Sequence, residues 1–150
     1  MPLIPAKRQR GYTLIEILVA SILLTGGLVG LASMQVNGTR LNNSAYLRSQ
    51  ANVIAYDIID RMRANRADAR AGAYDIGLAD ATPTLTTQVE DIDLVQWRTA
   101  IDYYLPAGRG SVDRVAGATA DDPARFTITV EWNDGREAGD EVQFQLVTEI

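Results

Sequence analysis

One acidic side chain stands at the start of a long apolar stretch near the beginning of the chain. Glu16 is followed by residues 17–39, which contain no charged side chain. An ionised carboxylate inside a lipid bilayer costs roughly 2.5 kcal/mol or more, so its presence there requires a reason. Two interpretations are open: the carboxylate reaches the membrane surface, or it pairs with a positive charge inside the membrane, which cancels much of the cost.

The other side chains that could support chemistry do not form a recognisable site. The chain has no cysteine and no histidine, which excludes disulfides, thiolate zinc sites and the commonest general base. Three acidic pairs lack the spacing of a calcium-binding loop: Asp91 with Asp93, Asp121 with Asp122, and Asp140 with Glu141. We interpret them as solvated surface acids. With no phosphate-binding loop and no Gly-x-Ser-x-Gly motif, we expect no enzyme, no metal site and no cofactor.

The distribution of charge predicts both the partners and the membrane topology. The net charge is −5, and it becomes −8 for residues 12–150 when Lys7, Arg8 and Arg10 are left out. An acidic chain of this kind is not expected to bind nucleic acid, which requires a basic face. Three cations just before the apolar stretch predict a cytoplasmic N-terminus, with the C-terminal mass on the other side of the membrane.

The apolar stretch is long enough to cross a membrane. Residues 17–34, with residues 12–15 in front of them, exceed the length of about 20 that a spanning helix needs. A secretory signal peptide is the nearest alternative, but its apolar region is shorter, and Gly30-Leu31-Ala32 is a poor cleavage site. We therefore predict a helix that stays in the membrane.

Three glycines interrupt this stretch, at positions 26, 27 and 30. They could allow close packing of helices, could reflect the greater frequency of glycine in membrane helices, or could be where the helix bends or melts. The sequence does not choose among these interpretations.

Helical periodicity continues beyond the apolar stretch. One stripe of apolar residues recurs at spacings of three and four: Leu47, Ala51, Ile54, Ile58 and Met62. Asp57 and Arg61 stand at the i,i+4 spacing that favours an ion pair. No proline occurs in residues 12–71, and Gly72 is a plausible stop. These features predict one helix from Tyr12 to about Ala71, whose second half packs under a globular domain.

The C-terminal half has the pattern of a small α+β domain. Residues 72–88 and 107–125 have loop composition, with a possible short strand at 112–115, and residues 91–105 form an amphipathic helix. Alternating segments at 126–132 and 142–146 predict an antiparallel hairpin with a connection longer than two residues. A hairpin alone is marginally stable, so the stripe on the long helix must cover it, with Trp97, Phe126 and Trp132 supplying bulk.

The N-terminal junction resembles the class III signal of type IV pilins and pseudopilins. The residues that carry the resemblance are Arg10-Gly11-Tyr12-Thr13-Leu14-Ile15-Glu16. The resemblance implies that a prepilin peptidase cuts after Gly11, that Tyr12 is then N-methylated, and that Glu16 pairs with the N-terminal ammonium of a neighbouring subunit. Tyr12 departs from the family, which usually has phenylalanine there, but it keeps the aromatic ring.

The same resemblance divides the chain into four segments. Residues 1–11 correspond to the leader peptide, 12–39 to the transmembrane and assembly half of the long helix, and 40–71 to its amphipathic half. Residues 72–150 correspond to a globular α+β head, so the whole fold is pilin-like, with a long helix packed on a small antiparallel sheet.

A second motif resembles the PilV branch of minor pilins, also called type IV pilus modification proteins. It is the stretch Asp60-Arg61-Met62-Arg63-Ala64-Asn65, with Arg48-Ser49-Gln50-Ala51 before it. The resemblance implies that Arg61, Arg63 and Asn65 contact a neighbouring minor pilin. The alternative is a solvated, salt-bridged helix face in which Asp60 and Arg63 pair with each other.

The resemblance as a whole implies a minor pilin that spans the bacterial inner membrane once and later enters a pilus fibre. Its expected partners are prepilin peptidase, the assembly platform, other minor and major pilins, and a tip adhesin, with a role in priming assembly at the pilus tip. Two alternatives stay open: a minor pseudopilin of a type II secretion system, and a membrane-anchored periplasmic binding module. Whether such pili serve twitching, adhesion or DNA uptake is not encoded in any motif.

Overall fold

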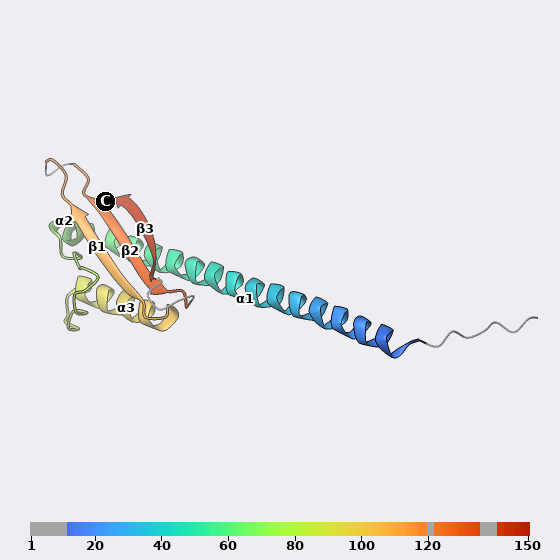
Figure 1. Ribbon diagram of the computed structural model, residues 1–150. Helices are drawn as coiled ribbons and strands as arrows, with labels where there is room; N and C mark the ends of the chain where they lie inside the picture. The colour runs from blue at the N-terminus through green and yellow to red at the C-terminus, as the bar shows by residue number, and fades with distance from the viewer. Residues whose placement is uncertain (1–11, 120–121, 136–140) are drawn as a thin grey trace, which may run out of the picture. The chain divides into compact units, whose positions relative to one another are not determined.

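The computed structural model describes residues 12–119, 122–135 and 141–150. Its elements follow one another as α1 (Leu14–Ala64), α2 (Arg66–Ala71), α3 (Val89–Tyr104), β1 (Arg109–Val115), β2 (Arg125–Asn133) and β3 (Glu141–Glu149) (Figure 1). The chain divides into two compact units, Met1–Asn42 and Asn43–Ile150. From here on, the head means this second unit, which adds the C-terminal part of α1 and the whole of α2 to residues 72–150.

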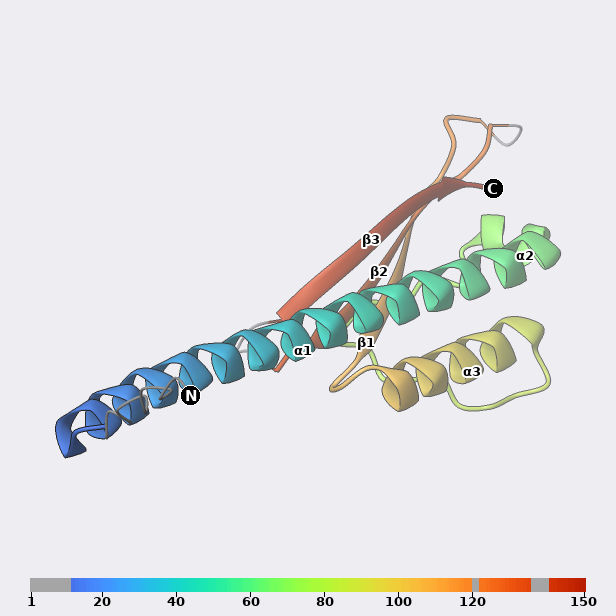
Figure 2. The ribbon, with the colours of Figure 1, turned by 90° about the vertical axis from the view of Figure 1, so that its right-hand side faces the viewer.

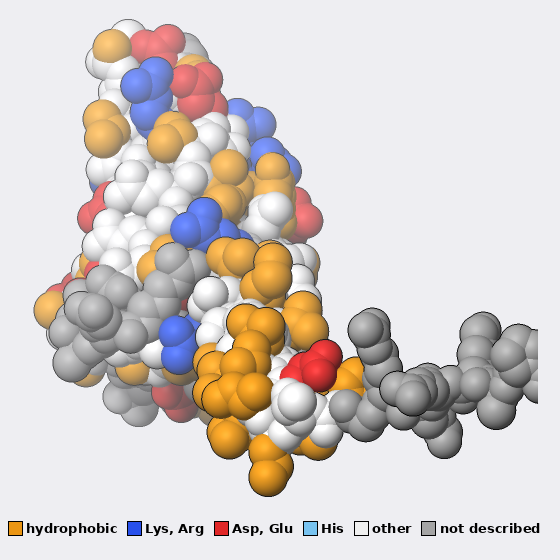
Figure 3. All heavy atoms as spheres, turned by 45° about the vertical axis from the view of Figure 1, so that its right-hand side comes forward, with side chains coloured by type: hydrophobic (Ala, Val, Ile, Leu, Met, Phe, Trp, Pro, Cys, Tyr) orange, Lys and Arg blue, Asp and Glu red, His pale blue; other side chains and the backbone are white. Residues whose placement is uncertain are grey.

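The N-terminal part of α1 is apolar and exposed. Its backbone becomes helical after Thr13, whose carbonyl oxygen accepts hydrogen bonds from the amides of Glu16 and Ile17 at 3.0 and 3.3 Å. Apolar side chains cover its surface in Figure 3. The hydroxyls of Ser21 and Thr25 donate to the carbonyl oxygens four residues earlier, both at 2.8 Å. These two hydroxyls are thus satisfied within the helix, as a lipid environment requires.

The glycines of this segment do not break the helix. α1 continues through positions 26, 27 and 30, and a β-carbon added at any of them would meet no atom within 4 Å. Packing inside the chain therefore does not explain why these positions are glycine.

The helix expected over residues 12–71 consists of two segments. Asn65 separates α1 from α2 with φ −111° and ψ 50°, values outside the helical region. Its side-chain amide contacts the hydroxyl of Tyr74 at 3.4 Å, a contact that sequence periodicity does not reveal. Gly72 ends α2 with φ +92°, the left-handed conformation typical of a helix stop, so the expected end point is confirmed.

The three strands form one antiparallel sheet in the order β1-β2-β3. β2 and β3 are the two arms of the predicted hairpin, with Phe126 opposite Thr148 and Trp132 opposite Val142. β1 includes the short strand predicted at 112–115 and begins three residues earlier. At the outer edge of β1, Val112 and Ile76 exchange two backbone hydrogen bonds.

The core of the head lies between the sheet and the helices α1 and α3, which pack on the same side of it (Figure 2). The predicted stripe on α1 is buried throughout: Leu47, Ala51, Ile54, Ile58 and Met62. The three aromatic residues expected to fill the core are also buried: Trp97, Phe126 and Trp132. The indole Nε1 of Trp97 donates to the carbonyl oxygen of Ile54 at 3.0 Å, which joins α3 to α1. The α+β arrangement is therefore the predicted one.

The central strand departs from the expected alternation. Thr129 and Glu131 face away from the core, yet they are only 4% and 5% exposed. Glu131 is covered by its neighbours: Arg109 Nη2 lies 2.8 Å from one carboxylate oxygen, and Gln143 Nε2 donates to the other at 2.7 Å. A central strand is flanked on both sides, so long polar side chains from β1 and β3 close over its outer face.

The loop before α3 contributes to the core. Tyr74 and Ile76 are buried, although their segment has the composition of a loop. Arg98 on α3 anchors the next turn by donating to the carbonyl oxygens of Gly77 and Asp80 at 2.6 and 2.9 Å.

A side chain at position 110 is expected to destabilise the head. A β-carbon at this position would lie 2.5 Å from both Trp97 Cη2 and Ile101 Cδ1. Gly110→Ala should therefore lower the free energy of unfolding of the head by about 1–3 kcal/mol through overpacking. Chemical denaturation followed by tryptophan fluorescence measures the effect. Gly38→Ala is the control, because a β-carbon there meets nothing, and equal stability of the two variants would contradict the prediction.

Candidate functional site

The first candidate site lies on the exposed N-terminal part of α1. Tyr12 and Glu16 line a shallow groove along one face of this segment, together with apolar and small residues at helical spacing: Ile17, Ala20, Ser21 and Leu24. Tyr12 is 78% exposed, and no cation of the described chain pairs with Glu16. Gly11, the other residue of the predicted cleavage site, lies outside the described residues.

Glu16 lies at the start of a helical segment with the length and composition of a membrane span. Among the described residues, only α1 contains a stretch long and apolar enough to cross a bilayer, with a mean hydropathy of 2.2 over eighteen residues and none of that stretch buried. A helix that is apolar on every side needs lipid or other helices around it. Glu16 stands in the first turn, where a helix dipole favours a negative charge.

The second candidate site is the polar end of the head around Arg61. The Arg61 guanidinium pairs with Asp57 on its own helix at 2.9 Å and with Asp93 on α3 at 3.0 Å. It also donates to Gln96 Oε1 at 2.7 Å. Tyr74 donates from its hydroxyl to the second oxygen of Asp93 at 2.7 Å. Arg61 is therefore held by partners on two helices of the head, and the pair predicted with Asp57 is confirmed.

The network raises the pKa of two of its ionisable groups, Arg61 and Tyr74. Burial opposes the positive charge of Arg61, but the hydrogen bonds and charges of Asp93 and Asp57 outweigh it and raise the Arg61 pKa. Burial raises the pKa of Tyr74, and the hydrogen bond to Asp93 raises it further. Both shifts favour the fully hydrogen-bonded arrangement at neutral pH.

The two other residues of the predicted contact motif differ in exposure. Asn65 lies against Tyr74 in the network described above. Arg63 is more than half exposed. It pairs with Asp60 at 3.3 Å, and its Nη2 donates to the hydroxyl of Thr148 at 3.3 Å. Of the two arginines, Arg63 is the more exposed.

The acidic pairs do not converge. Asp93 is 9% exposed and bonded to Arg61 and Tyr74, so its interpretation as a solvated surface acid was wrong. Its helical spacing from the α3 core residue Trp97 was the available signal. Within the described ranges, no cluster of three or more possible ligands could hold a metal ion. Asp121 and Asp140 lie outside those ranges.

Asp93→Ala is expected to destabilise the head. The change leaves Arg61 and Tyr74 without their shared acceptor, so we expect a loss of about 2–3 kcal/mol in the free energy of unfolding. Asp57→Ala is the matched control, because it removes an exposed partner and should cost no more than about 1 kcal/mol. Denaturation curves of the two variants measure the difference, and equal losses would show that Asp93 does not organise the network.

Because of Tyr74, the head should become less stable at alkaline pH. Because its pKa is higher in the folded chain than the ordinary value of 10.0, the unfolded chain loses the proton first. Stability should hold below about pH 10 and fall above it. Tyr74→Phe should lose the hydrogen bond at every pH but show a shallower decline between about pH 10 and 11. Parallel declines of the two proteins in thermal unfolding would contradict this assignment.

Comparison with known proteins assigns the N-terminal segment. A family model for the prokaryotic N-terminal methylation motif matches residues 6–32. No curated protein and no solved structure matches the chain. The matched range contains the predicted cleavage junction, Glu16 and the three glycines. Proteins with this motif are typically structural subunits, and the motif implies processing by a prepilin peptidase and assembly with other pilins. This chain thus carries the N-terminal methylation motif typical of type IV pilin-like proteins, and the motif overlaps the start of an apolar helix that fits a membrane anchor.

Proposed function

We propose that the chain is a minor pilin of the PilV type. It would wait in the inner membrane with its N-terminus in the cytoplasm and its head in the periplasm, and then join a type IV pilus. The observation that carries the proposal is an exposed apolar helix with a single acid, Glu16, in its first turn. This acid lies within the N-terminal methylation motif.

In this proposal the chain is a substrate before it is a subunit. Prepilin peptidase cuts between Gly11 and Tyr12, which removes Lys7, Arg8 and Arg10 together with the rest of the leader. Methylation then modifies the new amino group of Tyr12. Removal of these three cations is physically consistent with assembly, because placing a charged side chain in an apolar fibre core costs free energy.

Glu16 sets the register of assembly. Its carboxylate has no cation to pair with in the described chain, and it lies one helical turn from Tyr12 on the same face. The ammonium group of a neighbouring subunit would supply the missing charge within the membrane or fibre core. Such pairing offsets the cost of both charges and disfavours other registers.

The head would present the surface that recognises neighbouring subunits. Arg63 is the best placed of the three contact residues, since its guanidinium is exposed. Arg61 and Asn65 would act by holding the segment around Tyr74 in place. The expected partners are other minor and major pilins, the assembly platform and a tip adhesin, with the subunit at or near the pilus tip.

A deletion strain tests the proposal. Removing the gene should reduce surface pili, as counted by electron microscopy and by recovery of sheared fibres, and the intact gene should restore them. Secretion of folded exoproteins should not change. Normal piliation with impaired secretion would instead identify a pseudopilin, and no change in either would favour an anchored periplasmic module.

A further inference from the structure

The strand β3 leaves one edge of the sheet open. Within the described ranges it pairs with β2 alone. Ala124 and Ile150 exchange two backbone hydrogen bonds, at 3.1 and 3.0 Å, and they lie in the same register as the β2–β3 ladder. In an antiparallel ladder such pairs alternate, so the even-numbered residues of β3 bond to β2. The N–H and C=O groups of Gln143, Gln145 and Val147 therefore point away from the sheet.

This edge lacks the usual protection against pairing with another strand. Natural edge strands carry charges, prolines or bulges that discourage added strands. Residues 142–148 contain no charge, no proline and no glycine, and all of them pair regularly with β2. The edge is therefore a ready template for one more strand.

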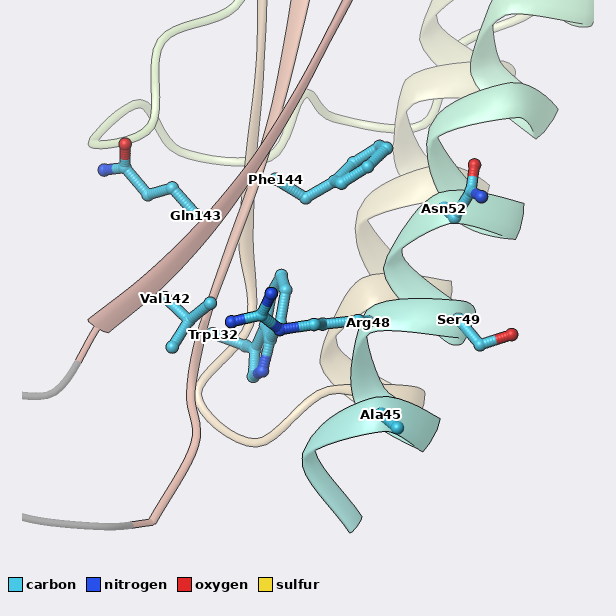
Figure 4. Close-up of a pocket in the computed structure, with 8 residues that line it drawn as sticks. All are labelled: Ala45, Arg48, Ser49, Asn52, Trp132, Val142, Gln143 and Phe144. Atoms are coloured by element: carbon cyan, nitrogen blue, oxygen red, sulfur yellow. The ribbon is translucent and has the colours of Figure 1, made fainter. Parts of the chain in front are cut away.

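A groove runs beside this edge, between β3 and α1. It has a volume of about 450 Å³. Figure 4 shows Trp132, Val142 and Phe144 on its sheet side and Ala45, Arg48 and Asn52 on its helix side. Val142 and Phe144 pack against the core but are only half-buried. A strand added to β3 would place every second side chain over these apolar groups.

Two hydrogen-bond donors at one end of the groove have no acceptor in the described chain. The indole Nε1 of Trp132 is buried without a partner, although Trp97, the other tryptophan, donates to a backbone carbonyl. Arg48 is exposed and forms no hydrogen bond or ion pair with the described residues, and its side chain extends from α1 toward Trp132 (Figure 4). A buried donor left unpaired costs about 1–3 kcal/mol, which an incoming acceptor would recover.

We propose that this groove binds an extended segment of another protein, which adds to β3 as a fourth, antiparallel strand and places a carboxylate beside Arg48 and Trp132. Since β3 begins at the Trp132 end of the groove, the C-terminal end of an antiparallel segment lies there. The matching segment has alternating apolar side chains and ends in an acidic group. The inference rests on the proposed function in that it supplies the contact by which the head would join a partner subunit.

A second copy of this chain fits the edge poorly. Two β3 strands paired antiparallel about Gln145 would place Glu141 of each opposite Glu149 of the other. Like charges directly opposite one another destabilise a strand pair. The unpaired guanidinium of Arg48 likewise favours a partner that brings an acid, which β3 itself offers only at its two ends.

A peptide tests this inference on the full chain in detergent micelles. The probe is a fluorescent, N-acetylated peptide of alternating threonine and valine, matched in length to β3 and ending in a free aspartate. Fluorescence anisotropy should show saturable binding, weakened about tenfold when the end is an asparagine amide. Arg48→Gln should remove this preference, since the group that distinguishes the two peptides is gone.

A substitution at the edge separates strand addition from simple charge attraction. Gln145→Pro removes an outward N–H without breaking the ladder to β2, as edge strands allow, and should weaken binding at least tenfold. Gln145→Thr keeps the N–H and should bind like the unchanged chain. The inference is overturned if the unchanged chain does not bind the peptide, if Gln145→Pro binds equally well, or if Arg48→Gln keeps the preference.

Failure of this inference differs from failure of the proposed function. A chain that starts at Tyr12 but does not bind the peptide would refute the strand addition alone. A chain that binds the peptide but is never cut at Gly11 would refute the pilin assignment alone.

Discussion

Glu16→Ala is expected to remove the chain from pili while leaving the head folded. An ionised carboxylate in an apolar environment costs roughly 2.5 kcal/mol or more, so it is retained there only if a partner compensates. The described chain offers no such partner, and in the proposed assembly the N-terminal ammonium of a neighbouring subunit would supply one. Without the acid, that ammonium stays unpaired in the fibre core, so we expect at least a tenfold loss of subunit in sheared fibres relative to the membrane pool.

Ser21→Ala is the matched control for this experiment. Ser21 lines the same face as Glu16, but its hydroxyl already donates to the carbonyl oxygen of Ile17 in the same helix. Its loss should leave incorporation unchanged. Immunoblots of the fibre and membrane fractions measure both variants, and normal incorporation of Glu16→Ala would refute the pairing and favour a carboxylate that simply reaches the membrane surface.

Gly11→Val is expected to block processing and, with it, assembly. The variant would keep Lys7, Arg8 and Arg10 attached to the apolar helix. Moving three cations into a fibre core is costly for each of them, so the chain should accumulate in the membrane and be absent from pili. The intact mass of the membrane-bound chain should retain the leader, whereas Gln9→Ala, which leaves the junction intact, should be processed. Fibres that contain uncut Gly11→Val subunits would contradict the prediction.

The elements that the sequence predicted well are those whose signals are local and periodic. The stripe from Leu47 to Met62 has helical spacing, and each of its residues is buried. The alternation in β3 likewise appears as alternating exposure along the strand. The N-terminal junction is a linear motif, which is why it could be recognised without any tertiary structure.

The features that the sequence did not predict depend on contacts between distant segments. Tyr74 lies in a stretch with the composition of a loop, yet it is buried, and its hydroxyl donates a hydrogen bond to Asp93 on α3. Glu131 has the polarity of an exposed strand residue, but Arg109 and Gln143 from two neighbouring strands cover it. Helical spacing can indicate that an acid such as Asp93 faces the core, but it does not identify a partner that lies tens of residues away.

The groove beside β3 belongs to this second group. Trp132 was expected in the core, and it is there. That its indole nitrogen has no acceptor within the described chain, and that Arg48 extends toward it, follows only from the packing of α1 against the sheet. Sequence patterns predict which residues are buried more readily than which polar atoms remain unpaired.

The central claim is that the mature subunit begins at Tyr12. Intact mass and N-terminal sequencing of the chain from the membrane fraction test it directly, and Lys7 adds a simple check because it is the only lysine. We predict a start at Tyr12 with one added methyl group and no primary amine to label. A start at Met1 or Pro2 in cells with active prepilin peptidase would contradict the account, and a start just after Ala32 would show a secreted protein instead.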